Sequence, residues 1–289
     1  MADLECPLCA FRMEIVDGIV HALPPERATH FARFTKDYEY IREAEGRSSD
    51  SDNYYLELPF RDITARNQNQ WTIRARSYAH LLKNVLAPEL PPDAVILDLG
   101  AGNCWMSYRL ALSGYRPVAV DLLTNDRDGL GAARHLRAHL PDSFSRFQAE
   151  MGSLPFEGEQ FDAVVFNASF HYAEDYQSVM GEALRCTRRG GLVIICDTPW
   201  YARDRSAQQM LEERRAQFLR KYGTDSSSIA SLEYLTDQRL RDLEERFSIH
   251  WKIYSPNYGL RWAMRPLVAR LRRRREPSRF RIYVAQKNA

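Results

Sequence analysis

The 289-residue sequence predicts an α/β fold built on a doubly wound, mostly parallel sheet. Three observations point to this fold: short apolar runs without polar alternation, helical stretches between those runs, and a glycine-containing turn directly after the first run. Strands that a parallel sheet buries on both faces are continuously apolar. Helices that alternate with such strands are typical of serial βα units.

The strand segments begin after a proline-containing stop near residue 90. We expect strands at Ala94–Leu97, Pro117–Val120, Phe144–Ala149, Phe161–Phe166 and Leu192–Ile195. Helical stretches lie between them, at 105–113, 130–140 and 175–186. Ahead of them, apolar residues spaced by three or four over residues 70–86 predict one face of an amphipathic helix.

The last third of the chain does not continue this alternation of strands and helices. Residues 206–222 predict a helix with Gly223 as its C-cap, and a second short helix carries Leu240, Leu243 and Phe247. Two further strands are expected at 249–254 and 280–284. The sheet should therefore end in an antiparallel hairpin with a long connection.

Composition and charge exclude several classes of protein. The chain is 45% hydrophobic and its net charge is only +2, so neither wholesale disorder nor a polyanionic partner is indicated. The start has no basic and apolar leader, and no apolar run reaches the roughly 18 to 20 residues of a membrane span. Five cysteines, an odd number, predict no disulfide framework. We expect a cytoplasmic protein.

The turn after the first strand carries the strongest functional signal. The strand ends in Asp98, and Gly100 and Gly102 follow directly before a helix. Glycines let the backbone approach a ligand closely, and free N–H groups at the helix start face that ligand. The second strand ends in Asp121, where a carboxylate can hold ribose hydroxyls. Together these residues predict a nucleoside-containing cofactor.

The type of cofactor follows from what surrounds the two glycines. A dinucleotide site would have a third glycine where this chain has Trp105, and the phosphate-binding Gly-Lys-Ser/Thr loop is absent. The acidic Asp98 favours an amino group rather than a phosphate. S-adenosylmethionine offers an amine and a ribose without phosphate.

Residues 95–284 resemble class I S-adenosylmethionine-dependent methyltransferases, most closely those that act on quinones and other small molecules. The resemblance rests on Asp98-Leu-Gly-Ala-Gly102 (with Cys104 in place of the third glycine of the family), Asp121, Glu150-Met-Gly-Ser-Leu-Pro-Phe156, Phe161 to His171, and Arg189-Gly-Gly191. It implies S-adenosylmethionine as cofactor and a set of cofactor-binding residues. That set is Asp98, Gly100, Ala101, Gly102, Asp121, Leu122, Glu150, Met151 and Asn167.

The resemblance also implies an architecture: a Rossmann-like, seven-stranded, mostly parallel sheet with helices on both faces and an added helical lid. We expect four segments. These are a lid with a zinc-knuckle-like start (1–65), the methyltransferase core (66–199), a helical insertion over the substrate (200–246) and a strand hairpin that completes the core (247–289).

Methyl transfer from a sulfonium is an in-line displacement, so the protein mainly positions the acceptor and, where needed, removes a proton. His171, Asn167 and Tyr172 follow the fourth strand and are the candidate catalytic residues, with His171 the candidate base. Residues 167–170 lack the two prolines typical of base N-methyltransferases. In the loop after the second strand, Asn125, Asp126 and Asp128 either border the site or cap the next helix, and we favour capping.

The first residues resemble a shortened Trm112-like zinc module. Cys6 and Cys9 form half of a zinc site, and the run Asp17–Pro24 resembles the end of such modules. Four ligands are normally needed, and no second cysteine pair follows. We therefore expect a remnant that holds no metal.

Nine arginines and one glutamate lie between Arg261 and Arg281. Such a run is most often a solvated helix face, but its apolar side also permits peripheral contact with an anionic membrane. Aromatic residues of the two expected lid segments suggest an apolar or ring-bearing acceptor: Tyr38, Tyr40, Tyr54, Tyr55, Trp200, Tyr201 and Tyr234. The overall prediction is a methyltransferase for a small, apolar or aromatic acceptor, with no nucleic-acid partner expected and the oligomeric state open. Two alternatives remain: a ribosomal or transfer RNA methyltransferase, and a cofactor-binding subunit that does not catalyse.

Overall fold

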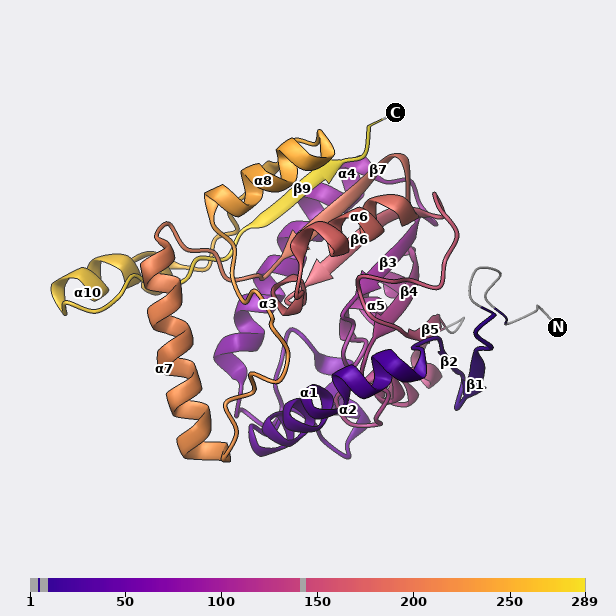
Figure 1. Ribbon diagram of the computed structural model, residues 1–289, viewed down its shortest axis with the longest axis horizontal. Helices are drawn as coiled ribbons and strands as arrows, with labels where there is room; N and C mark the ends of the chain where they lie inside the picture. Colours follow the sequence, from indigo (N-terminus) through magenta and orange to yellow (C-terminus); the bar gives the residue numbers. More distant parts are fainter. Residues whose placement is uncertain (1–4, 6–9, 141–143, 289) are drawn as a thin grey trace.

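The computed structural model describes residues 5, 10–140 and 144–288, and within them a single sheet of nine strands forms the centre of the molecule (Figure 1). Its strand order is β1-β2-β5-β4-β3-β6-β7-β9-β8. The strands are β1 (Glu14–Val16), β2 (Ile19–His21), β3 (Val95–Leu99), β4 (Arg116–Asp121), β5 (Ser145–Gln148), β6 (Phe161–Asn167), β7 (Thr187–Cys196), β8 (Lys252–Tyr254) and β9 (Ile282–Gln286).

The seven strands from β5 to β8 confirm the predicted sheet. β5, β4, β3, β6 and β7 are parallel, and β9 runs antiparallel to both β7 and β8. The expected antiparallel hairpin with a long connection is therefore present. At the other edge, β1 and β2 add a hairpin that the sequence analysis did not place in the sheet, and β2 pairs parallel with β5. Asp17 and Gly18 both have positive φ, as a two-residue hairpin turn requires.

Helices cover both faces of the sheet, which explains why the strands are apolar throughout. Alternate residues of β3 enter different cores, because successive side chains of a strand point to opposite faces. Ile96 packs with α3 (Gln68–Leu81), η1 (Leu82–Leu86) and α5 (Trp105–Leu112), whereas Leu97 packs with α6 (Tyr176–Cys186) and α8 (Asp237–Phe247).

Two helix predictions need correction. Residues 130–140 are not an α-helix but two 3₁₀ segments, η2 (Leu130–His135) and η3 (Arg137–His139). Gly131 lies so close to the preceding loop that a Cβ would be 2.7 Å from the Thr124 carbonyl oxygen, and this close packing accompanies the tighter winding. The helix predicted over 70–86 starts at Gln68 and continues through the π-helical turn η1 into α4 (Ala87–Glu89).

The remaining helices lie outside these two layers. They are α1 (Pro25–Ala44), α2 (Asp52–Glu57), η4 (Phe170–Tyr172), α7 (Asp204–Tyr222), α9 (Leu260–Ala263) and α10 (Arg265–Leu271). Gly223 ends α7 with φ 72°, so the predicted C-cap is confirmed. Figure 1 shows α1 along one end of the sheet, and α7 and α10 at the opposite side of the molecule from β1 and β2.

Residues of α1 and Ile229, in the segment after α7, line the cavity described below, and a lid formed by these two parts of the chain stays a prediction. The division into segments at residues 65, 199 and 246 stays a prediction. Among the described residues, no helix has both the length and the apolar character that crossing a membrane demands.

Candidate active site

A cavity of about 340 Å³ opens at the carboxyl ends of β3, β4 and β6, where ligands bind in open α/β sheets. All nine residues predicted to bind the cofactor line it: Asp98, Gly100, Ala101, Gly102, Asp121, Leu122, Glu150, Met151 and Asn167. The structure therefore brings together residues that the sequence separates by up to 69 positions. Their individual roles are a matter for the proposal below.

The backbone between β3 and α5 adopts the conformation that the glycine motif predicts. Gly100 and Gly102 have φ of 77° and 53°, the left-handed region that favours glycine. Cys104, in place of the family's third glycine, also has φ 63° and is fully buried at the N-cap of α5. Cys104 thus keeps the turn of the motif, although a left-handed backbone conformation is less favourable for cysteine than for glycine.

Asp98 has an unsatisfied oxygen at the cavity. Its side chain is 1% exposed, and Oδ2 accepts a hydrogen bond from the Ser107 hydroxyl at 2.7 Å. Oδ1 is buried and has no hydrogen-bond partner within the described part of the chain. The pKa of Asp98 is raised to about 7, chiefly by burial and also by the nearby Asp121 carboxylate, while the hydrogen bonds from Ser107 oppose the shift. A buried acceptor without a donor fits a ligand amine.

Asp121 holds the turn in place while facing the same cavity. Its Oδ2 accepts from the Gly102 N–H at 2.8 Å, and its Oδ1 accepts from the Leu123 N–H at 2.9 Å. Burial raises the pKa of Asp121 to about 6, although these backbone bonds favour its charged form. A carboxylate has about four acceptor positions, so two remain for ligand hydroxyls.

The three candidate catalytic residues are placed differently. Asn167 ends β6 and lines the cavity. Tyr172, the last residue of η4, lines it as well. His171 does not line the cavity; its ring is buried, and burial lowers its pKa to about 4. A base in catalysis must reach the proton that it removes. The geometry gives His171 no support as the base, and its role stays a prediction.

Helix α1 supplies several residues of the cavity wall, and the sequence analysis singled out only Tyr38 among them. Phe31, Phe34, Tyr38 and Arg42 recur at spacings of three and four, and all four line the cavity. That helical spacing is the signal that could have found them. By contrast, most of the aromatic residues that the sequence suggested for the substrate lie in the core or in solvent, and Tyr38 alone among them lines this cavity.

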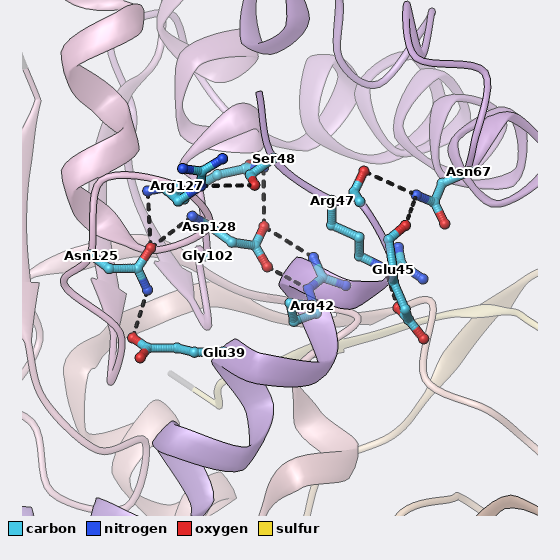
Figure 2. Close-up of polar contacts among 12 residues, drawn as sticks. Glu39, Arg42, Glu45, Arg47, Ser48, Asn67, Gly102, Asn125, Arg127 and Asp128 are labelled. Atoms are coloured by element: carbon cyan, nitrogen blue, oxygen red, sulfur yellow. Dashed lines mark hydrogen bonds and ion pairs between the residues drawn. The ribbon is translucent and has the colours of Figure 1, made fainter. Parts of the chain in front are cut away.

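Ion pairs fix α1 to the loops of the site. Arg27 donates two hydrogen bonds to the Glu150 carboxylate, at 2.7 and 2.6 Å. At the other end of the helix, Arg42 binds both oxygens of Asp128, and Glu39 accepts a hydrogen bond from the Asn125 amide at 2.7 Å (Figure 2). The helix is thus held on both sides of the cavity.

Figure 2 also corrects the preference for helix capping in the loop after β4. The N-cap of η2 is Gly129, and no side chain caps it. Asn125 Oδ1 instead accepts from the N–H groups of Arg127 and Asp128, closing a turn within the loop. Asp128 borders the cavity and pairs with α1, which is the reading that the sequence left as second choice.

We expect Arg42→Met to destabilise the protein by about 3–5 kcal/mol, because it leaves the carboxylate of Asp128 buried without its partner. Urea unfolding monitored by fluorescence would measure the change. Arg33→Met is the matched control, since Arg33 lies on the same helix with an exposed side chain and should change stability by no more than about 0.5 kcal/mol. Equal stability of the two variants would contradict the role given to the Arg42–Asp128 pair.

Cys6 and Cys9 lie outside the described residues. Among the residues that are described, no group of histidine, cysteine and acidic side chains is arranged to hold a metal ion.

Comparison with known proteins agrees with this geometry. Residues 97–195 match the family model described as a methyltransferase domain. A candidate sarcosine dimethylglycine methyltransferase from Galdieria sulphuraria has the same fold, with a TM-score of 0.54 and 15% identity over 88% of this chain and 98% of that one. This chain carries a class I S-adenosylmethionine-dependent methyltransferase domain.

Two curated relatives resemble part of this chain. The demethylmenaquinone methyltransferase of Mycobacterium marinum is 31% identical over 111 residues, 38% of this chain and 44% of the relative. The ubiquinone/menaquinone biosynthesis C-methyltransferase of Rhizobium rhizogenes is 24% identical over 124 residues, 42% of this chain and 48% of the relative. The chain thus spans less than half the length of these relatives.

Proposed function

We propose that this protein transfers a methyl group from S-adenosylmethionine to a small, apolar or aromatic acceptor. The observation that carries the proposal is the unpartnered Asp98 oxygen at a cavity formed by strand ends. The methionine amine of the cofactor would be a donor for it. When bound, S-adenosylmethionine supplies a methyl group activated by the positive charge on sulfur.

The residues present fit this cofactor. We assign Asp98 to the amine, Asp121 to the ribose hydroxyls, and the turn at Gly100–Gly102 to close backbone contact. Leu122 and Met151 would flank the adenine, beside Glu150, whose carboxylate is held by Arg27. Asn167 lies at the tip of β6 and lines the same cavity.

The acceptor side of the cavity is aromatic, which supports a ring-bearing or apolar acceptor. It consists of residues from α1, α3, η4 and the segment after α7. These are Phe31, Phe34, Tyr38, Trp71, Tyr172 and Ile229. Aromatic walls exclude water and bind flat apolar groups by area and edge-to-face contact. The names of the quinone methyltransferase relatives support the same class of acceptor.

The proposal is tested by incubating the protein with methyl-labelled S-adenosylmethionine and an extract of its source cells. We expect label in the organic-soluble or aqueous small-molecule fraction. Label in RNA would overturn the small-molecule acceptor in favour of the RNA alternative. Loss of transfer in the double variant Asp98→Asn/Asp121→Asn is the control that the label arises in this site.

Peripheral membrane contact through Arg261–Arg281 is a second part of the proposal. The exposed apolar residues of α9 and α10 recur at helical spacing among the arginines: Leu260, Met264, Leu267 and Leu271. Leu260 and Leu271 are 79% and 76% exposed, and α10 extends away from the sheet (Figure 1). An apolar side flanked by arginine is typical of helices that lie on anionic lipid.

We expect the protein to sediment with vesicles of phosphatidylglycerol but not with vesicles of phosphatidylcholine. Leu271→Glu should abolish sedimentation, because it places a charge on the apolar side of α10. Leu219→Glu, on the exposed side of α7, is the matched control and should leave binding unchanged. Equal sedimentation of the two variants would rule out this surface.

A further inference from the structure

A second cavity, of about 220 Å³, adjoins the candidate active site. The two cavities share five lining residues from α1, α3 and η4: Phe34, Tyr38, Arg42, Arg74 and Tyr172. Phe34, Tyr38 and Tyr172 belong to the aromatic acceptor side, and Arg42 and Arg74 lie on the helices α1 and α3 that supply that side. The second cavity is therefore an extension of the proposed acceptor pocket.

This extension is rich in positive charge. Arg42, Arg47, Arg74 and Arg214 line it, against the two carboxylates of Glu45 and Glu233. Three of the arginines have acidic partners. Arg42 pairs with Asp128, Arg47 with Glu45 at 2.6 Å, and Arg214 with Glu233 at 2.7 Å. The pairs at Arg42 and Arg47 are drawn in Figure 2.

Arg74 has no such partner. Its guanidinium lies 4.9 Å from the centre of the Trp71 ring, and it makes no hydrogen bond or ion pair with any described residue. Burial lowers the pKa of Arg74, and the positive charges of Arg42 and Arg47 lower it further, while the carboxylate of Asp197 opposes this shift without forming an ion pair with Arg74. Arg74 is half-buried, and a guanidinium that has lost part of its water without gaining a hydrogen-bonding partner is stabilised by a bound anion.

Two of the paired arginines also have spare donors. Arg47 Nη1 and Arg214 Nε are buried without a hydrogen-bond partner among the described residues. The residue Arg47 as a whole is only 5% exposed. Unsatisfied buried donors are rare, because each costs about 1–3 kcal/mol. Both residues line the same cavity as Arg74, so the wall of this cavity carries more guanidinium donors than the described residues satisfy.

We infer that the methyl acceptor carries an anionic group, a carboxylate or a phosphate, that Arg74 binds together with Arg47 and Arg214. This inference rests on the proposed function, since it assigns the far end of the same acceptor. The aromatic walls would hold the apolar part of the acceptor near Asn167, and its anionic group would extend into the second cavity. Guanidinium groups bind both kinds of anion through paired hydrogen bonds.

The test measures anion binding to the protein saturated with S-adenosylhomocysteine, by titration calorimetry with benzoate and with inorganic phosphate as probes. We expect at least one probe to bind, and Arg74→Gln to weaken that binding by about tenfold or more. Tighter binding of benzoate identifies a carboxylate, and tighter binding of phosphate identifies a phosphate. Arg76→Gln, an exposed arginine on the same helix, should leave binding unchanged.

Three results would overturn the inference. The first is that neither probe binds, and the second is that Arg74→Gln and Arg76→Gln bind a probe equally. The third is that Arg74→Gln weakens the affinity for S-adenosylhomocysteine itself, which would assign Arg74 to the cofactor carboxylate. If the wild-type protein did not bind S-adenosylhomocysteine at all, the proposed function would fail, and this is measured before any anion is added.

Discussion

Replacing Asp98 by asparagine should weaken the affinity for S-adenosylhomocysteine by about 100-fold, because the variant loses a buried charge-assisted hydrogen bond to the ligand amine. Asparagine keeps an oxygen that can accept from Ser107, so the fold should survive. Titration calorimetry measures the affinity. Asp126→Asn, an exposed residue of the loop after β4, is the matched control and should bind normally.

The raised pKa of Asp98 gives this prediction a pH dependence. With a pKa of about 7 in the free protein, the ionised fraction falls from about nine-tenths at pH 8 to about one-tenth at pH 6. A ligand ammonium needs the ionised form, so wild-type affinity should fall about tenfold over that range. The affinity of the Asp98→Asn variant should not show this tenfold fall between pH 8 and pH 6. If its affinity fell as steeply as that of the wild type, the assignment of Asp98 to the amine would be contradicted.

The stability of the folded protein without ligand should fall as the pH rises, whereas its affinity for the ligand rises. Asp98 has a higher pKa in the folded chain than its ordinary value of 3.8, so its ionisation is disfavoured by folding. The resulting cost is absent below about pH 4 and grows as the pH rises to about 7, reaching at most about 4 kcal/mol. Without ligand, Asp98→Asn should therefore be more stable than the wild type at pH 8. Their urea midpoints should converge as the pH falls towards 4.

The sheet could be predicted from the sequence because its signals are local. Each parallel strand is a short apolar run, and the two glycines after β3 fix a turn that few other residues allow. The cofactor side of the cavity follows, since strand order alone brings the tips of β3, β4 and β6 together. Where local signals were weaker, as at residues 130–140, packing against the loop replaced the expected α-helix by 3₁₀ turns.

The acceptor side could not be predicted in the same way because its residues come from distant parts of the chain. Phe34 of α1, Arg74 of α3 and Tyr172 of η4 meet only in the folded molecule. Arg74 resembles any other arginine of a helix in the sequence. Only the tertiary structure shows that the arginines around it have acidic partners, while it forms no ion pair with any residue that the structure describes. Pairing between distant charges has no local pattern.

Gly100→Ala should destabilise the protein by about 3 kcal/mol or more, combining the cost of a left-handed side chain with a severe overlap. The new Cβ would lie 2.2 Å from the Ser169 Cβ, and the φ of Gly100 is 77°. Because Ser169 donates a hydrogen bond to the Leu99 carbonyl, it cannot move aside without losing that bond. Thermal unfolding and the yield of folded protein measure the effect.

Gly102→Ala measures the cost of the left-handed backbone conformation without an atomic overlap like that at residue 100. Gly102 also has a positive φ, of 53°, but the nearest atom to an added Cβ is the Asp128 carbonyl oxygen at an ordinary 3.6 Å. This variant should lose only about 1 kcal/mol. The double variant Gly100→Ala/Ser169→Gly removes the overlapping atoms and should regain part of the lost stability, beyond the effect of Ser169→Gly alone. If the serine change restored nothing, the contact between the β3 turn and the tip of β6 would not be what requires glycine at position 100.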